Sequence, residues 1–160
     1  MARLSDLSAR HQLFMRTYRY RSVDWRPGAR LTRKVDACRV AVVTTAAFFL
    51  PDQEPFEVES RGGDVTYRVI PRGADLSTLD HAHKSNAFKH ESMERDPNVA
   101  LPLDRLEVMA AEGMIRSVAP RHFSFMGSIS APARLVQRTA PSVARALRQD
   151  GVDVVLLTPV

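Results

Sequence analysis

Short runs of branched apolar residues, separated by turn residues, recur along the chain and predict the strands of a buried sheet. Residues 38–51 form one nearly continuous apolar run closed by Pro51, which is typical of a strand buried on both faces of a parallel sheet. Residues 64–71 alternate between two faces and predict a second strand. A short strand is expected over residues 117–119, and the last strand over residues 152–160.

Three other segments repeat their apolar residues at intervals of three and four, which predicts amphipathic helices. They cover residues 4–20, 101–115 and 131–149. Because Pro141 lies inside the third segment, we expect a kink there or two short helices. The polar stretch 72–98 is long for a connection, and such loops are usually functional or disordered.

The order of these elements predicts an α/β protein with a mainly parallel sheet, of the Rossmann or flavodoxin-like kind. We expect a basic N-terminal helix and connector over residues 1–37, followed by an α/β domain over residues 38–160. In a doubly wound domain a covering helix would follow the last strand, and none follows residues 152–160. The domain is therefore expected to be incomplete at its C-terminus.

Composition assigns the chain to the ordinary globular class. It has 160 residues, of which 44% are hydrophobic and 26% charged, values that suit one domain with one core. It contains no apolar window long enough for a membrane span and no apolar signal-peptide core. Its single cysteine, Cys38, has no partner for an intramolecular disulfide, so we expect a reducing, cytoplasmic location.

Positive charge is concentrated at the start of the chain. Ten of the 23 Lys and Arg residues lie within residues 1–39, against three Asp. Such an arm could bind nucleic acid or an anionic surface, or it could pack along its own domain or on a partner subunit. Because no known nucleic-acid-reading motif accompanies the charge, we favour packing.

The segment 119–127 offers the densest group of reactive side chains, and it follows a predicted strand, where an open sheet presents its ligand site. Arg121 could hold a carboxylate with two parallel hydrogen bonds and His122 could transfer a proton near neutral pH. Ser124 supplies a hydroxyl. A turn with a capping arginine and a packed pair of phenylalanines is the alternative, and both readings stay open.

Two further groups of candidates also have structural alternatives. Thr44 and Thr45 could bind an anion or only satisfy a turn after the first strand. His81, His83 and His90 could ligate zinc or iron, but their spacing is unspecific, and we favour a polar surface loop. The sequence contains no phosphate-binding glycine loop, nucleophile elbow or His-Glu-x-x-His motif, so no complete catalytic set is recognised.

Several longer stretches carry a family resemblance. They are RVAVVTTAAFFLPDQEPF, GDVTYRVIP, DPNVALPLDRL, EGMIRSVAPRHFSFMG and APSVARALRQDGVDVVLLTPV. The most specific parts are Pro-Leu-Asp-Arg-Leu at 102–106, Ser-Val-Ala-Pro-Arg-His at 117–122 and the terminal Leu-Leu-Thr-Pro-Val. With these segments the chain resembles the selenoprotein B family of glycine, sarcosine, betaine and D-proline reductases over nearly its whole length.

The resemblance implies an oxidoreductase subunit. In the family, the Thr-Pro-Val strand end is followed by a redox residue, a selenocysteine or a cysteine, with a second cysteine three positions on. Members cleave a carbon–nitrogen bond next to a carboxylate in a small amino acid or betaine-like substrate, with the selenolate or thiolate as nucleophile. The implied cofactor is selenium, as selenocysteine, and the implied partner is a partner reductase subunit or a thiol reductant.

On this basis we expect the redox residue directly after Val160 and expect the 160-residue chain by itself to be inactive. Since UGA encodes selenocysteine, our hypothesis is that Val160 precedes an in-frame UGA. A fragment of a cysteine-containing homologue and a decayed gene are the alternatives. The resemblance further suggests that Arg121 holds the substrate carboxylate and that His122 protonates the leaving amine.

The chain also departs from the expected pattern. Where a glycine is expected after Thr44-Thr45-Ala46, it has Ala47-Phe48-Phe49, and the histidine-rich loop carries Lys84 and Lys89. These differences leave the substrate open. Two other functions remain open: a non-catalytic binding module that docks a partner through the basic arm, and a metal-dependent enzyme that uses the three histidines.

Overall fold

The computed structural model describes residues 8–17, 24, 28–82 and 91–160 of the chain. Within it two units are distinguished, Met1–Arg30 and Leu31–Val160. The first unit contains helix α1 (Ala9–Thr17), which lies within the helix expected near the N-terminus. The expected domain boundary after residue 37 stays a prediction.

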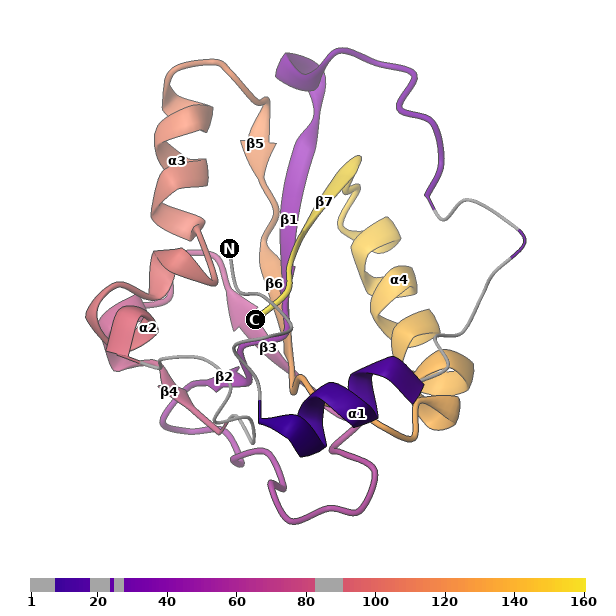
Figure 1. The fold of residues 1–160 in the computed structure, drawn as a ribbon. Coiled ribbons are helices and arrows are strands. Elements are labelled where there is room, and N and C mark those ends of the chain that lie inside the picture. Colours follow the sequence, from indigo (N-terminus) through magenta and orange to yellow (C-terminus); the bar gives the residue numbers. More distant parts are fainter. Residues whose placement is uncertain (1–7, 18–23, 25–27, 83–90) are drawn as a thin grey trace. The chain divides into compact units, whose positions relative to one another are not determined.

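A five-stranded sheet forms the centre of the second unit among the residues that are described (Figure 1). Its central strand runs parallel to three of the others and pairs with all three, while the remaining strand adds antiparallel to the far side. The strands are β1 (Arg39–Thr44), β3 (Tyr67–Pro71), β5 (Ser117–Val118), β6 (Arg121–Phe125) and β7 (Val154–Thr158).

Strand β1 is the centre of this sheet because both of its edges are paired. Strand β7 pairs along one edge, from Val40↔Val154 to Thr44↔Thr158. On the other edge, β5 pairs with the start of β1 and β6 with its end, and β3 pairs antiparallel with β6. Within the described chain, no strand pairs with the outer edge of β7.

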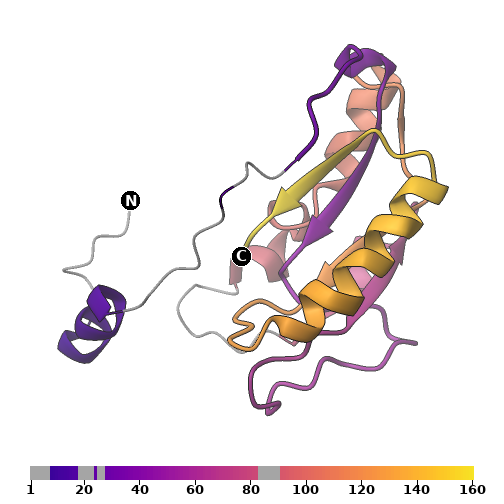
Figure 2. The same cartoon turned by 90° about the vertical axis from the view of Figure 1, so that its right-hand side faces the viewer.

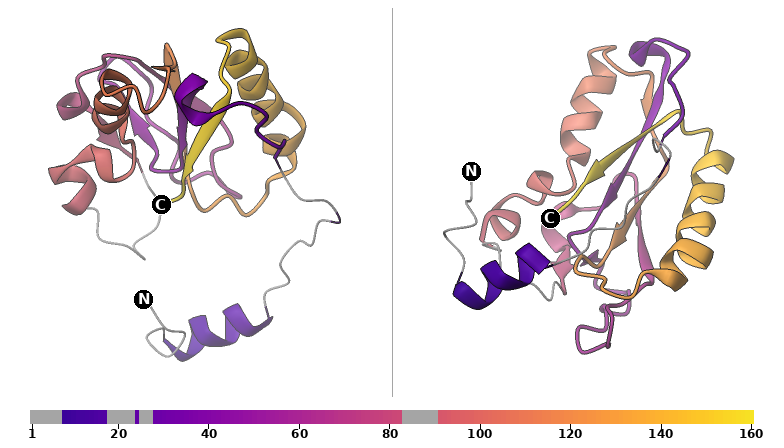
Figure 3. Two further views of the ribbon diagram at one scale, coloured as in Figure 1. Left: turned by 90° about the horizontal axis from the view of Figure 1, so that it is seen from above. Right: turned by 45° about the vertical axis from the view of Figure 1, so that its right-hand side comes forward.

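Helices cover both faces of the sheet (Figures 2 and 3). Helix α3 (Leu103–Ala111) and the short α2 (Glu91–Arg95) lie on one face, and α4 (Ala140–Gln149) lies on the other. Successive side chains of a strand point to opposite faces, so each strand supplies both cores. The core under α3 includes Val40, Val42, Ile70, Leu101, Leu103, Leu106, Ile115 and Val118. The core under α4 includes Ala41, Ala119, Phe123, Phe125, Val143 and Leu147.

The apolar run 38–51 forms two strands, so the prediction of one continuous strand was wrong. Strand β1 ends at Thr44, and β2 (Phe48–Phe49) begins after a turn in which Ala47 has a φ of 56°. A left-handed residue cannot continue an extended strand. Strand β2 instead pairs antiparallel with β4 (Asp80–His81) in a separate small sheet.

The segment 119–127 was expected to be a loop, and this was also wrong, because most of it is strand β6. Pro120 has no N–H to donate to a ladder, so the pairing along β1 breaks between β5 and β6 and then resumes. The helical region expected around Pro141 is present. It consists of a π turn (Leu135–Thr139) followed directly by α4, with the proline in the first turn of α4.

Among the described residues, the remaining regular elements are three single turns of 3-10 helix: Val35–Ala37, Leu76–Thr78 and Pro97–Val99. The mainly parallel sheet and its covering helices confirm the predicted α/β class. The Rossmann or flavodoxin-like label stays a prediction. Of the helices described, none has the length and apolar character that a membrane crossing requires.

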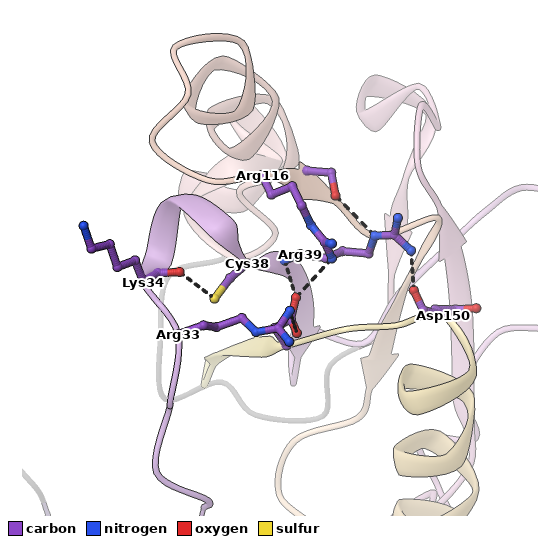
Figure 4. Close-up of polar contacts among 8 residues, drawn as sticks. Arg33, Lys34, Cys38, Arg39, Arg116 and Asp150 are labelled. Atoms are coloured by element: carbon purple, nitrogen blue, oxygen red, sulfur yellow. Dashed lines mark hydrogen bonds and ion pairs between the residues drawn. The ribbon is translucent and has the colours of Figure 1, made fainter.

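Charged residues lock the amino-terminal edge of the sheet (Figure 4). The Asp153 carboxylate accepts a hydrogen bond from the Arg39 backbone amide at 2.8 Å and pairs with Arg33 at 3.0 Å and Arg116 at 3.2 Å. The Arg39 guanidinium donates to the Asp150 carbonyl at 2.5 Å. These contacts join the start of β1 to the segment before β7. They therefore help to position both strands, which are paired up to Thr44 and Thr158 at the opposite edge.

We expect Asp153→Asn to lower the thermal stability of the protein, because the amide cannot pair with two arginines. The Arg39 amide, followed by the nearby guanidiniums of Arg33 and Arg116, lowers the pKa of Asp153. A lowered folded-state pKa adds stability above the unfolded-state pKa, and that stability is lost as pH falls through the folded value. Thermal melts from pH 7 to pH 2 should therefore converge for the two proteins at acidic pH. The exposed Asp52→Asn is the matched control, and an equal loss in both variants would contradict the role of Asp153.

Candidate functional site

Three parallel strands end together at the carboxyl edge of the sheet. Strand β1 ends at Thr44, β6 at Phe125 and β7 at Thr158, and Thr44 pairs in register with both Ser124 and Thr158. In open α/β sheets, ligands bind just beyond this edge. The candidate site therefore consists of the residues that follow these strand ends and the side chains that hold them.

The two threonines that end β1 hold the segment after β7. The backbone amide of Thr45 donates to the Thr158 carbonyl at 3.2 Å, and the Val160 amide donates to Thr45 Oγ1 at 2.9 Å. The hydroxyl of Thr44 donates to the Thr158 carbonyl at 3.3 Å. Thr158 Oγ1 in turn donates to the Ala100 carbonyl at 2.7 Å. In this structure the two expected substrate-binding hydroxyls thus position residues 158–160.

The turn that follows these threonines is tightly bonded. The amide of Ala46 donates to Thr44 Oγ1 at 3.2 Å, and the amide of Ala47 donates to the Phe125 carbonyl at 2.8 Å. Ala47 is fully buried at a φ of 56°, a conformation that costs a non-glycine residue energy and is found mainly where the surrounding structure enforces it. The family resemblance leads us to expect a glycine in this stretch, where the chain has Ala47-Phe48-Phe49. That departure was the one sequence signal for this turn.

Ser124 is the fourth hydroxyl at this edge, and it faces the core under α3. Its side chain is completely buried, and among the described residues its Oγ has no hydrogen-bond partner. Its register opposite Thr44 places it beside the turn. Buried hydroxyls are usually satisfied, which makes Ser124 an available polar group close to the site.

His122, the predicted proton donor, lies inside β6 and is completely buried. Its Nδ1 accepts a hydrogen bond from the Val42 amide at 3.0 Å, and thus satisfies a β1 amide close to the break at Pro120. Burial lowers the pKa of His122 to about 4, although the nearby Glu107 carboxylate opposes that change. The ring is therefore neutral at pH 7. Its Nε2 finds no partner in the part of the chain that is described.

Arg121, the predicted carboxylate clamp, is the first residue of β6 and lies three positions before Ser124, the partner of Thr44 at the carboxyl edge. Its guanidinium makes a bidentate ion pair with Asp150, with N–O distances of 2.7 and 3.0 Å. Arg121 and His122 do follow the end of β5, but the expectation that they lie in a loop was wrong, because one begins β6 and the other lies within it. Their predicted chemical roles stay predictions.

Of the histidines considered as metal ligands, only His81 lies within the described residues. It belongs to β4, with Nε2 3.7 Å from a Glu94 oxygen and Nδ1 3.8 Å from an Asp80 oxygen. It borders a cleft of about 680 Å³ whose wall is rich in acidic side chains. His83 and His90 lie outside the described residues. Among those that are described, no three His, Cys, Asp or Glu side chains are placed to hold a metal ion.

Cys38 is buried at the opposite edge, where its Sγ contacts the Lys34 carbonyl at 3.1 Å (Figure 4). It therefore does not contribute to the candidate site. Thr158, by contrast, is a site residue that the sequence analysis named only as part of the Thr-Pro-Val strand end. Its bond to Ala100 joins residues 58 positions apart, and no local pattern reports such a contact.

We expect the unfolding free energy to show a pH dependence that comes from His122. Below about pH 6.5 the unfolded chain binds a proton on this side chain, whereas the folded chain stays neutral down to about pH 4. Stability from this group is complete above pH 6.5 and falls by up to about 3 kcal/mol as pH drops through that window. Denaturant unfolding of His122→Asn should lack this component, since asparagine keeps an acceptor for Val42 but does not titrate.

A second variant separates titration from hydrogen bonding. His122→Leu leaves the Val42 amide unsatisfied and should cost about 1–3 kcal/mol at pH 7, whereas His122→Asn should cost less. If wild type and His122→Asn keep the same pH dependence between pH 6.5 and pH 4, the buried neutral state of His122 is contradicted.

Comparison with known proteins was made by family and by individual relative. The family model described as "Glycine/sarcosine/betaine reductase selenoprotein B" matches residues 8–160. The D-proline reductase subunit gamma of Acetoanaerobium sticklandii is 31% identical over 134 residues, covering 84% of this chain and 52% of the relative. The betaine reductase complex component B subunit beta of Peptoclostridium acidaminophilum is 32% identical over 125 residues, covering 74% of this chain and 27% of the relative.

The chain thus spans about half of one curated relative and about a quarter of the other. No solved structure gives a significant match. The family model covers nearly every residue, including both threonines, β6 and the end of β7. The chain therefore belongs to the glycine/sarcosine/betaine reductase selenoprotein B family.

Proposed function

We propose that this chain forms the substrate-facing part of a reductase subunit that cleaves a carbon–nitrogen bond in a small amino acid or betaine-like substrate. The family match and the names of the two relatives support a role in a reductase complex. The observation that carries the proposal is the hydrogen bond from the Val160 amide to Thr45 Oγ1. It directs the Thr158–Val160 segment across the edge at which parallel sheets bind ligands.

The redox residue belongs, in this proposal, directly after Val160. A selenolate or thiolate there would supply the nucleophile that displaces the amine from the carbon beside the substrate carboxylate. Thr44 and Thr45 would act as positioning residues, because their hydroxyls hold the backbone that leads to the nucleophile. Ser124 Oγ has no partner among the described residues, and it would bind substrate only once its completely buried side chain is uncovered.

Arg121 and His122 fit their predicted roles only if each exchanges its present partner. Arg121 would have to release Asp150 before it could bind a substrate carboxylate. His122 would have to gain both a proton and access to solvent before it could act as an acid. The contacts of both residues instead support structural roles: Arg121 fixes the segment before β7, and His122 completes the bonding of β1.

The partner subunit would bind along the outer edge of β7. Leu157 is 68% exposed and Leu156 is 40% exposed on opposite faces of this strand. Strands of parallel sheets are usually buried on both faces, and an unpaired edge is a template for another strand. The two relatives are named as subunits, which supports a protein partner for this edge.

Extending the protein past Val160 tests the enzymatic proposal. We expect the codon after Val160 to be UGA or a cysteine codon. We expect the extended protein, supplied with a dithiol and its partner subunit, to release ammonia or an amine from glycine, sarcosine or betaine, or to open the ring of D-proline to a linear amino acid. Thr45→Val should lower kcat by about fivefold through the loss of one hydrogen bond of about 1 kcal/mol. Thr45→Ser, which keeps the acceptor, is the matched control.

Three outcomes contradict this proposal. They are a UAA or UAG codon with no downstream frame, full activity after the residue following Val160 is changed to serine, and equal activity of the Thr45→Val and Thr45→Ser variants. The first two overturn the redox residue, and the third overturns the positioning role of Thr45.

The partner edge has a separate test. In a complex reconstituted from the extended protein and its partner subunit, the amides of β7 that point outward should exchange with solvent more slowly than in the free subunit. Leu157→Lys should weaken the complex in native mass spectrometry, whereas Val136→Lys, at a 51% exposed apolar site in the π turn before α4, should not. Unchanged exchange in β7 would exclude strand pairing at this edge.

A further inference from the structure

A second cleft lies between the start of β3 and the helical segment formed by the π turn (Leu135–Thr139) and the first residues of α4. It has a volume of about 570 Å³, and its wall includes Tyr67 together with Arg138, Ser142 and Arg145. No carboxylate lines it. Two cations and no anion therefore line the same open cleft, which is the composition of an anion site.

The helix presents these groups on one face. Residues four and seven positions apart stack on the same side of a helix, so Ser142 lies between Arg138 and Arg145. Residues 131–149 contain four arginines and no acidic residue. The two guanidiniums that line the cleft consequently have no carboxylate on their own helix to neutralise them.

These arginines differ from those at the opposite edge of the sheet. Arg33, Arg116 and Arg121 each pair with an aspartate, whereas the contacts found in the described part of the chain include no ion pair or side-chain hydrogen bond for Arg138 or Arg145. An arginine pair held in a cleft without counter-charge is free to make bidentate hydrogen bonds to an oxyanion.

The backbone supports the same assignment. A π turn, Leu135–Thr139, carries Arg138, and Pro141 follows it in the wall of the cleft. π turns are rare and are frequently found at functional sites. Tyr67 forms the opposite wall, where its ring packs on Phe123 and Phe125 at centroid distances of 5.6 and 5.9 Å. A rigid apolar wall opposite two cations suits a small organic anion.

The position of the cleft is also informative. The helix begins after β6, so its π turn is near the carboxyl edge of the sheet, and Tyr67 pairs in register with Phe125 at the end of β6. The cleft therefore opens near the edge that carries the candidate site, while its wall is built from different residues.

We infer that this cleft is an oxyanion-binding site that takes the carboxylate or phosphate group of a small molecule through Arg138, Arg145 and the hydroxyl of Ser142. The inference does not depend on the proposed reductase activity, since the site lies entirely within this chain. The site uses a pair of arginines that the sequence analysis did not consider, and it is separate from the proposed role of the ion-paired Arg121.

The inference is tested by NMR titration of the 160-residue chain with inorganic phosphate and, separately, with acetate, at ionic strength held constant with chloride. We expect saturable shifts of the Tyr67 and Ser142 signals with at least one of these probes. Arg138→Ala and Arg145→Ala should each weaken binding about tenfold, the loss expected for a hydrogen bond to a charged group. Circular dichroism verifies that the variants fold, which we expect because both side chains are exposed.

The matched control is Arg148→Ala, which removes the same charge from the same helix outside the cleft. Binding of phosphate but not acetate identifies a phosphate site, and the reverse identifies a carboxylate site; either supports the inference. Equal weakening in all three variants would reduce the effect to general electrostatics and overturn the site. Shifts that do not exceed those produced by chloride alone would overturn it as well.

Discussion

The arrangement of the whole carboxyl edge depends on how β1 leaves the sheet. Both edges of β1 are paired up to Thr44. Directly after this residue the chain turns sharply and enters β2. The turn is held by bonds from Thr45 to the end of β7 and from Ala47 to the end of β6. Ala47 accepts an unfavourable left-handed conformation because these partners come from separate strands and fix the backbone between them.

Charge is used differently at the two edges of the sheet. At the amino-terminal edge, arginines pair with Asp150 and Asp153 and lock the strands that begin there. At the carboxyl edge, hydroxyls hold the backbone, and Arg138 near the start of the α4 helix has no ion-pair partner among the described residues. At the amino-terminal edge the charged groups are therefore paired with one another, whereas the carboxyl edge keeps polar groups that can bind a ligand. This division agrees with where parallel sheets bind small molecules.

The sequence was sufficient for the class and the family but not for the site. Apolar runs and helical periodicity identified the buried strands and the covering helices, because burial leaves a direct mark on residue type. The break after Thr44 was missed, since an alanine does not indicate a positive φ and the absence of the expected glycine was interpreted only as a difference in substrate. The strand character of the segment after Pro120 was missed because Arg, His and Ser within it suggested a loop.

What the sequence by itself determined is the alternation of elements, the α/β class and the family, all of which rest on local pattern and on motifs of contiguous residues. Only the tertiary structure decided what the polar residues do. Arg121 meets Asp150 across 29 positions and His122 meets Val42 across 80, so their partners could not be read locally. Neighbours along a strand also point to opposite faces, which separates two residues that stand side by side in the sequence.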